Sequence, residues 1–253
     1  MKNERRRFLI IILIIFLVIL LLFMIYALRN ALILSNIDKM VTNLENNHQN
    51  IYAKIVTNDI SGNITSSEHF LKDNVYKRVT KVDNPATDNI DLIVTTFTYS
   101  SSQKVFTEIG DNRILSINDS IKTPVRGYHI DNATYAIIMN LGHNENFFIQ
   151  GLASISSNIK TVEVDGKEYY LIKNFISSDY MYDTDAKEIV AYVEKDTGLP
   201  FKIVETLEKD GATFEKISSF EYKFNYVTDS DMIEPDEAMF SIYENWYSWF
   251  VNS

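Results

Sequence analysis

Cysteine is absent from this 253-residue chain, and proline and glycine are scarce, with four and eight residues respectively. The lack of cysteine excludes disulfide bonds, thiolate metal sites, iron–sulfur clusters and a catalytic thiol. It also excludes a lipid attached to an N-terminal cysteine, as bacterial lipoproteins carry. Because no covalent cross-link is available, a folded domain of this chain must be stabilised by burial alone.

Recognised catalytic motifs are also missing. The sequence contains no GxSxG nucleophile elbow, no Walker loop and no GxGxxG nucleotide fingerprint. The four histidines are His48, His69, His129 and His143, and none lies three to five residues from another or belongs to an HExxH pair. That spacing does not support a metal site. We therefore predict no catalytic, cofactor-binding or metal-binding residue, and the alternative is a hydrolase with an unrecognised site.

Two short motifs have simpler structural interpretations. Asp196-Thr197-Gly198 copies the aspartic-protease triplet, but Glu194-Lys195 precedes it, Leu199-Pro200 follows it, and there is no second copy. Such proteases need two carboxylates that share a proton, so we interpret the triplet as part of a turn. The stretch Asp229–Glu237 has the carboxylate density of a calcium loop but lacks the glycine at position six and the acid at position twelve. We interpret this stretch as an extended acidic turn.

Acidic side chains outnumber basic ones outside the N-terminus. The formal net charge of the chain is −10, and residues 1–7 hold four basic side chains and one acid, so residues 8–253 carry −13. Nucleic acids and anionic lipid surfaces are bound by basic patches. The negative sign therefore argues against nucleic acid as a partner and against docking on an anionic lipid surface.

The longest hydrophobic run, Phe8 to Leu28, contains no charged residue and no Pro, Gly, Asn or Gln. Its 21 residues would form a helix of about 31 Å, which matches the hydrocarbon core of a bilayer. A cleaved signal peptide is the competing interpretation, but its apolar core is only about 7–15 residues long and ends in a small-residue cleavage site. The exit from this run has no such site. We therefore predict an uncleaved signal-anchor.

The flanking charges and a change in periodicity divide the chain. Basic residues lie before the run and Arg29 alone follows it closely, so the positive-inside rule places residues 1–7 in the cytoplasm and the rest of the chain beyond the membrane helix 8–28. Residues 29–48 carry an apolar stripe at spacings of three and four, which predicts a juxtamembrane helix in which Ser35 or Asn36 could cap a fresh start. Residues 49–253 are predicted to form one extracytoplasmic domain.

Alternating patterns fill most of that domain. Ile51, Ala53 and Ile55 alternate with more polar neighbours, and runs of the same kind follow at short intervals, separated by turn residues. The runs are His69–Leu71, Val75–Val82, Ile90–Ser100, Lys104–Ile109, Arg113–Ile117, Lys160–Val164, Glu168–Phe175, Glu188–Glu194, Phe201–Leu207 and Ala212–Tyr226. Between Pro124 and Gly151 the pattern instead predicts two short helices, over 131–142 and 144–153. The domain is therefore expected to be α+β, with a large antiparallel sheet.

The C-terminal stretch Met239–Val251 is far more apolar than an ordinary terminus. Its candidates for a partner or interface surface are Tyr243, Trp246, Tyr247, Trp249 and Phe250. Because large exposed apolar patches are uncommon, we expect this stretch to pack onto the sheet and close the core. The alternatives are a surface that docks a partner and an aromatic anchor at the outer leaflet.

The order of several segments resembles a known family. They are Asn50–Val56, His69–Val79, Val164–Lys173, Tyr192–Lys202 and Phe220–Asp236. The phrase EKDTGLP, followed by FEYKFNYVTDSDMIEPD, is the most specific part. The chain resembles the LolA/LolB/RseB-like half-barrel proteins, and within them the clostridial relatives of the spore germination lipoprotein GerS. GerS-type proteins carry a lipidated cysteine, whereas this chain has a hydrophobic helix in its place.

The resemblance implies a curved antiparallel half-barrel with a few packed helices, whose concave face binds acyl chains or a protein partner. In the GerS branch it implies a non-enzymatic partner of a cell-wall amidase. We therefore expect a single-pass cell-membrane protein with its N-terminus in the cytoplasm. Its extracytoplasmic domain would be a binding or scaffolding module in cell-envelope or spore-cortex processes, without a cofactor.

Overall fold

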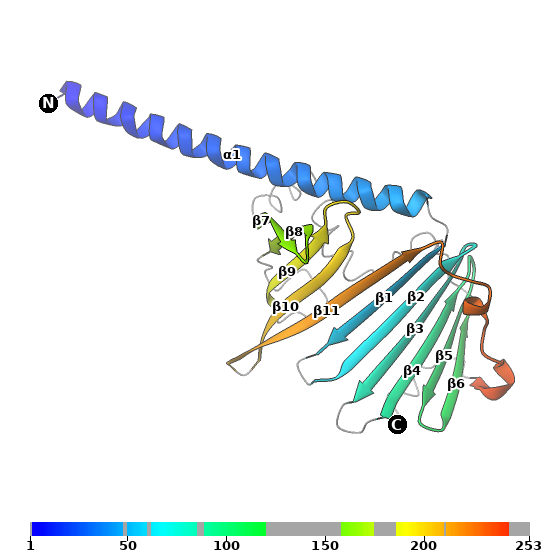
Figure 1. Ribbon diagram of the computed structural model, residues 1–253. Helices are drawn as coiled ribbons and strands as arrows, with labels where there is room; N and C mark the ends of the chain where they lie inside the picture. Colours follow the sequence, from blue (N-terminus) through cyan, green and yellow to red (C-terminus); the bar gives the residue numbers. More distant parts are fainter. Residues whose placement is uncertain are drawn as a thin grey trace.

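One long helix and one large sheet make up the architecture of the computed structural model (Figure 1). The structure describes residues 2–47, 50–59, 62–84, 89–119, 158–174, 186–209 and 211–242. The elements are α1 (Lys2–Asn47), β1 (Ile51–Asn58), β2 (Ile64–Lys72), β3 (Val75–Asn84), β4 (Asn89–Thr98), β5 (Gln103–Ile109), β6 (Asn112–Asn118), β7 (Asn158–Val164), β8 (Lys167–Asn174), β9 (Ala186–Glu194), β10 (Pro200–Lys209), β11 (Ala212–Phe224), the 3-10 turns η2 (Ser230–Met232) and η3 (Glu237–Met239), and β12 (Ser241–Ile242). The two helices expected at 131–142 and 144–153 lie outside the described residues.

The sheet is a curved antiparallel meander whose first strand lies in its interior. The strand order is β12-β6-β5-β4-β3-β2-β1-β11-β10-β9-β8-β7, and every pair is antiparallel except the short β12–β6 pair. The chain therefore builds one half outward from β1 to β6, and then builds the other half inward from β7 until β11 pairs with β1. The predicted fold class, α+β with a large curved antiparallel sheet, is confirmed.

The predicted hairpins at 72–75 and 164–167 are confirmed. They could be predicted because the conformation of a tight turn depends on the residues within it. In the β7–β8 turn, Asp165 and Gly166 have φ values of 51° and 77°, which is the left-handed pair that an Asp-Gly hairpin turn requires. Asp73 and Asn74 adopt φ values of 51° and 63° between β2 and β3. These turns fix the register of the flanking strands and so decide which face of the sheet each side chain occupies.

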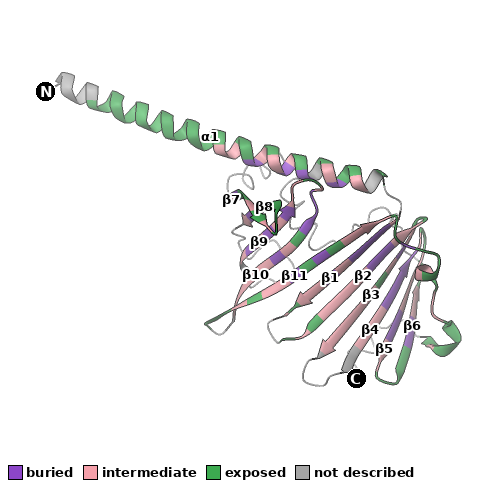
Figure 2. Ribbon diagram, viewed as in Figure 1, coloured by how far each residue is buried: buried purple, intermediate pink, exposed green. Residues whose placement is uncertain are grey.

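The helix α1 runs without interruption through both segments that the sequence distinguishes, and no fresh start occurs at Ser35 or Asn36. The side chains from Phe8 to Ile25 are all exposed, whereas the later turns are buried on the side that meets the sheet (Figure 2). Leu34, Ile37 and Val41 form the buried stripe. This spacing of three and four places one helical face against the sheet.

The side of the sheet that carries α1 is called the helix face here. Its core under α1 contains side chains from β1 and β7 to β11, together with the β9–β10 turn. The cluster comprises Leu34, Ile37, Val41, Ile55, Ile159, Ile172, Ile189, Ala191, Val193, Leu199, Ile203 and Phe220. The alternation predicted for β1 is confirmed, because Ile55 lies in this cluster while its neighbour Tyr52 packs on the other side.

The other side of the sheet, the opposite face, is covered over β1 to β6 by the segment Asn225–Ile242. Val227 and Met232 pack against Tyr52 and Phe70. Further along, Phe240 packs on a cluster of Phe97, Phe106 and Leu115. The Phe240 and Phe106 rings meet edge to face at 5.1 Å between centroids. Among the described residues, the apolar clusters of the two halves therefore lie on opposite faces of the sheet.

Candidate functional site

The Asp196-Thr197-Gly198 triplet forms the predicted turn between β9 and β10. The Thr197 hydroxyl donates to Glu194 Oε2 at 3.0 Å and accepts from the Leu199 amide at 3.2 Å, and the Gly198 amide donates to the Glu194 carbonyl at 2.9 Å. These bonds stay within the turn, and Asp196 is exposed. The geometry is that of a local structural motif, and the aspartate is an exposed member of that turn.

Gly198 in this turn also packs closely against α1. Its φ is +73°, and a Cβ added there would lie 2.9 Å from the Ile37 carbonyl oxygen and 3.2 Å from side-chain atoms of Met40 and Val41. Glycine is therefore required twice, for its backbone conformation and for the space it leaves. The turn locks one level of α1 against the sheet.

The acidic stretch Asp229–Glu237 is held by lysines that project from the opposite face. Lys72 pairs with Asp229, and Lys77 donates to the Asp231 carbonyl at 2.5 Å. Lys104 contacts carboxylates of both Glu234 and Glu237 at 2.8 Å. The Asp231 side chain instead caps its own turn, accepting from the Thr228 amide and hydroxyl. Lys104 thus holds two of these carboxylates and Lys72 holds a third, so the interpretation as an acidic turn is supported.

The titration of these groups reflects partial burial. Burial raises the pKa of Glu234, and the nearby Glu237 carboxylate adds to the effect, although Lys104 lies between the two. Burial lowers the pKa of Lys77, whose ammonium lies 5.4 Å from the Phe70 ring centroid and 5.3 Å from that of Phe97. The hydrogen bond from the Thr228 hydroxyl lowers the pKa of Asp231. These pKa shifts arise from the contacts that attach the segment Asn225–Ile242 to the sheet, and the groups that carry them do not form a shared reactive centre.

On the helix face, strands β2 to β5 carry buried polar side chains among apolar ones such as Leu71 and Val105. His69 Nδ1 lies 2.6 Å from the Tyr76 hydroxyl, and both side chains are buried. Gln103 Nε2 donates to Thr98 Oγ1 at 3.1 Å. The buried polar side chains of this region are His69, Thr96, Thr98 and Thr107. Hydroxyl and imidazole groups bind polar partners, whereas an acyl chain needs an apolar lining.

Metal ligands and candidate bases do not converge anywhere in the described ranges. No group of three or more His, Asp or Glu side chains there could hold a metal ion. The histidine that falls in those ranges, His69, lies beside Tyr76 and is 4% exposed. A general base must reach a proton on a bound substrate, so a buried imidazole beside a phenol gives little support to hydrolysis.

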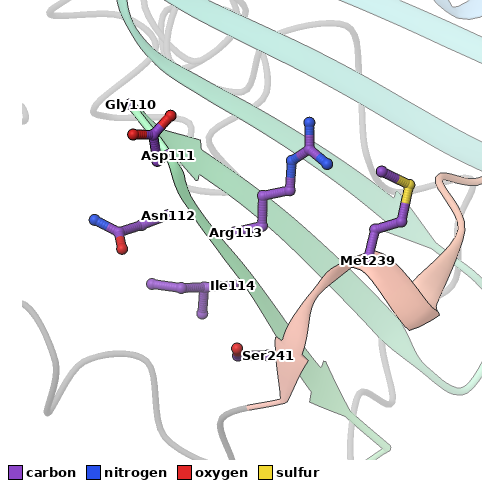
Figure 3. Close-up of a pocket in the computed structure, with 7 residues that line it drawn as sticks. All are labelled: Gly110, Asp111, Asn112, Arg113, Ile114, Met239 and Ser241. Carbon is purple, nitrogen blue, oxygen red and sulfur yellow. The ribbon is translucent and has the colours of Figure 1, made fainter.

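A surface hollow lies at the sheet edge where β12 meets β6 (Figure 3). It has a volume of about 550 Å³ and is lined by Gly110, Asp111, Asn112, Arg113, Ile114, Met239 and Ser241. The Arg113 Nε lies 3.2 Å from a Glu108 carboxylate oxygen. We call these lining residues together with Ile242 the β6-edge surface. It combines a cation, an anion, an amide and apolar side chains, a mixture typical of protein–protein contacts.

The predicted interface residues Tyr243, Trp246, Tyr247, Trp249 and Phe250 lie outside the described residues. Three apolar residues that precede them are described, and these differ in how far they are buried. Phe240 packs into the core, whereas Met239 and Ile242 are 55% and 65% exposed. Phe240 therefore packs as core closure requires, the expectation for the rest of the stretch stays a prediction, and β12 attaches the start of the aromatic stretch to the β6-edge surface.

Sequence reasoning missed the hollow and the path of the segment Asn225–Ile242. Both arise because residues far apart in the chain meet: Asn50 and Val227, 177 positions apart, exchange two hydrogen bonds of 2.7 Å. The lysines of the first strands were the available signal. Lys72, Lys77 and Lys104 all point to the opposite face, where the acidic stretch lies.

Comparison with solved structures finds similar chains of low sequence identity. A crystal structure of an uncharacterized conserved protein from Thermus thermophilus is 9% identical with a TM-score of 0.43, and the match covers 81% of this chain and 98% of that one. A LolA superfamily protein from Nitrosomonas europaea is 10% identical with a TM-score of 0.27, covering 78% and 97%. MucB, solved in complex with MucA(peri), is 9% identical with a TM-score of 0.31, covering 79% of this chain and 59% of MucB.

No protein-family model matches the chain, and no curated protein matches it. Similarities at these identities and TM-scores leave the function to be inferred from the residues of this chain.

Proposed function

We propose that this protein is a membrane-anchored, extracytoplasmic binding or scaffolding protein without catalytic activity. The observation that carries the proposal is the division of α1. Its side chains from Phe8 to Ile25 are exposed on every face, and its later turns enter the core of the sheet. A helix this long and apolar is stable when lipid surrounds it. The candidate span, Phe8–Leu44, is the one found in the described ranges.

The orientation follows from the charges at the two ends of the apolar run. Lys2, Arg5, Arg6 and Arg7 precede it, against the single acid Glu4. Basic residues are retained on the cytoplasmic side, so the sheet lies outside the cytoplasm. The negative charge of the remaining chain is consistent with a domain that does not dock on anionic lipid.

A protein partner is favoured over an acyl ligand by the lining of the helix face. Under β7 to β11 the apolar side chains of this face are already covered by Leu34, Ile37 and Val41 of α1. Over β2 to β5 the same face carries buried hydroxyl groups and His69 between its apolar side chains. An acyl chain placed there would cover polar groups without hydrogen-bonding them.

The partner is proposed to bind at the β6-edge surface and at the aromatic residues that follow Ile242. These are the predicted interface residues Tyr243, Trp246, Tyr247, Trp249 and Phe250. Aromatic side chains next to a mixed polar rim are typical of interfaces. The GerS resemblance makes a cell-wall amidase the first partner to test, with other envelope proteins as the alternative.

The anchor is tested by membrane fractionation. Full-length protein should stay in the membrane pellet after a carbonate wash, and protease added to intact protoplasts should digest the sheet domain. Release of a soluble product that begins near residue 30 would show that the helix is a cleaved signal. A domain that is digested only after lysis would reverse the orientation.

The partner site is tested by cross-linking in cells. A chain that stops after Ile242 should stay in the membrane but lose its cross-linked protein partner, whereas Asp196→Asn should retain it because that carboxylate lies in a structural turn. The alternative, an acyl ligand, is tested by mass spectrometry of the protein extracted without delipidation. A bound acyl lipid in place of a cross-linked protein would overturn the choice of partner.

A further inference from the structure

The geometry of α1 points to a second property, which rests on the proposed membrane anchor. We infer that the helix holds the sheet rigidly, with the edge strand β7 against the headgroup layer of the outer leaflet and the β6-edge surface farthest from the membrane. Three features of the described residues lead to this orientation: the continuity of α1, its attachment to the sheet, and its direction across the strands.

The first feature is the absence of a hinge between the exposed and the buried part of α1. The apolar run ends at Leu28, and Asn30 is already fully buried at 0% exposure, followed by Leu34 at 4%. Neither glycine nor proline occurs between residues 28 and 47, and the helix is unbroken there. Helices bend sharply at such residues or at inserted turns, so a straight continuation is expected.

The second feature is the fixation of the helix on the sheet. The buried stripe Leu34, Ile37 and Val41 covers about two turns, and Gly198 contacts the backbone at the middle of that stripe. A Cβ at Gly198 would lie 2.9 Å from the Ile37 carbonyl oxygen, which leaves no room for α1 to slide or roll. The domain and the helix therefore move as one body.

The third feature is the direction in which α1 crosses the sheet. Figure 1 shows the N-terminal half of the helix extending beyond the β7 side, and its C-terminal end lying above β11 and β1. Strand β7 is consequently next to the membrane. The strand order then leads away from the bilayer through ten spacings to β6, about 48 Å along the curved sheet at 4.8 Å per spacing.

The surface that would meet the lipid has suitable chemistry. Lys160, Glu163 and Lys167 on β7 and β8 are exposed, and they carry both signs of charge. Such side chains suit the hydrated headgroup layer and not the hydrocarbon core. β7 is also the terminal strand of the sheet on this side among the described residues. An open strand edge favours pairing between chains, and a lipid surface beside it would hinder that approach.

This orientation also separates two roles considered for the aromatic C-terminal stretch. Ile242 pairs beside β6, at the sheet edge opposite β7. The start of the stretch therefore lies at the end of the domain that faces away from the bilayer. That position favours contact with a protein partner over insertion in the outer leaflet.

The absence of cysteine makes the orientation directly measurable, because one introduced cysteine is a unique label. Lys160→Cys on β7 and Asp111→Cys at the β5–β6 turn are both exposed positions. Each full-length variant is labelled with a fluorophore and reconstituted in phosphatidylcholine vesicles that contain a headgroup-nitroxide quencher. The label at residue 160 should lose most of its fluorescence, and the label at residue 111 should lose none.

A matched pair carries a flexible Gly-Ser linker inserted between Leu28 and Arg29, which removes the rigid connection. In that pair the difference in quenching should disappear. Equal quenching at both positions without the linker, in protein that still floats with the vesicles, would overturn the orientation and leave the anchor intact. Protein that fails to float with the vesicles would overturn the proposed anchor itself.

Discussion

At the scale of single residues, Gly198 shows what a sequence can and cannot disclose. The turn Thr197-Gly198-Leu199-Pro200 follows from its composition, and a positive φ at the glycine follows from that turn type. The contact with Ile37 does not follow, because it joins a turn to a helix far away in the sequence. The backbone conformation of Gly198 was predictable from the sequence. Its contact with Ile37, which leaves no space for a larger side chain, was not.

Gly198→Val should destabilise the protein by at least about 1 kcal/mol from backbone strain alone, and by more because of the clash with α1. The free energy of unfolding is measured by urea titration of the full chain in detergent, followed by circular dichroism. Gly211→Val is the matched control, since Gly211 has a φ of +77° but nothing within 4 Å of an added Cβ. Equal losses at the two positions would mean that the contact with α1 contributes nothing.

Tyr52 provides a prediction for alkaline pH. Burial is the main cause that raises the pKa of Tyr52, and the hydrogen bond from its hydroxyl to Glu68 at 3.0 Å adds to it. The folded state then keeps a proton that the unfolded state releases above about pH 10. The native protein should therefore lose stability as the pH rises through this window, because the folded state binds more protons.

Tyr52→Phe removes the ionisable hydroxyl and with it this dependence of stability on pH, and it also removes the hydrogen bond to Glu68. At neutral pH the variant should be less stable by about 1–3 kcal/mol. Above about pH 10 the difference in unfolding free energy between the variant and the native protein should narrow. Parallel stability curves across the alkaline range would show that Tyr52 ionises equally in both states.

At the scale of elements, the strands were predictable because their hydrophobic alternation has a period of two. The segment from Asn225 to Ile242 was not predictable as a cover, since its apolar residues follow no regular period. Its attachment depends on separate contacts from Val227, Met232 and Phe240. Composition alone indicated only an acidic turn followed by an aromatic stretch.

Phe240→Ala should destabilise the protein by about 1–3 kcal/mol, less than for a fully buried phenylalanine, because the ring is only partly buried against Phe106. Met239→Ala is the matched control, since Met239 is 55% exposed and should change stability by less than about 0.5 kcal/mol. Thermal unfolding of both variants measures the difference. A larger loss of stability in Met239→Ala than in Phe240→Ala would contradict the prediction, because it would mean that the contacts of Met239 in the hollow stabilise the fold more than the packing of Phe240 does.

At the scale of the whole molecule, the sheet order was beyond sequence reasoning. Neighbouring hairpins were predictable from turns, but nothing local indicates that β11 pairs with β1 and not with an outer strand. The pairing is set by which edges remain free and by the common need to cover the apolar stripe of α1. Strand β1 consequently contacts both halves of the molecule.

Ile55→Asp on β1 should therefore abolish folding of the whole sheet, because a charge would be placed in the core under α1. Both halves should lose protection from hydrogen exchange together. Ile64→Asp is the control, at a position that is 40% exposed on β2. Retained protection in β3 to β6 of the Ile55→Asp variant would show that the first half folds without the second.

The interior position of β1 has a consequence for how the protein folds during its synthesis. In the proposed topology the sheet domain is exported, and β1 to β6 can form hairpins as soon as they emerge, but β11 completes the sheet only when Phe224 arrives. Until then one edge of β1 and the apolar stripe of α1 remain without their partners. Slow closure of such distant contacts exposes a nascent chain to aggregation. We expect maturation of this protein to depend on a folding helper at the exit of the export channel.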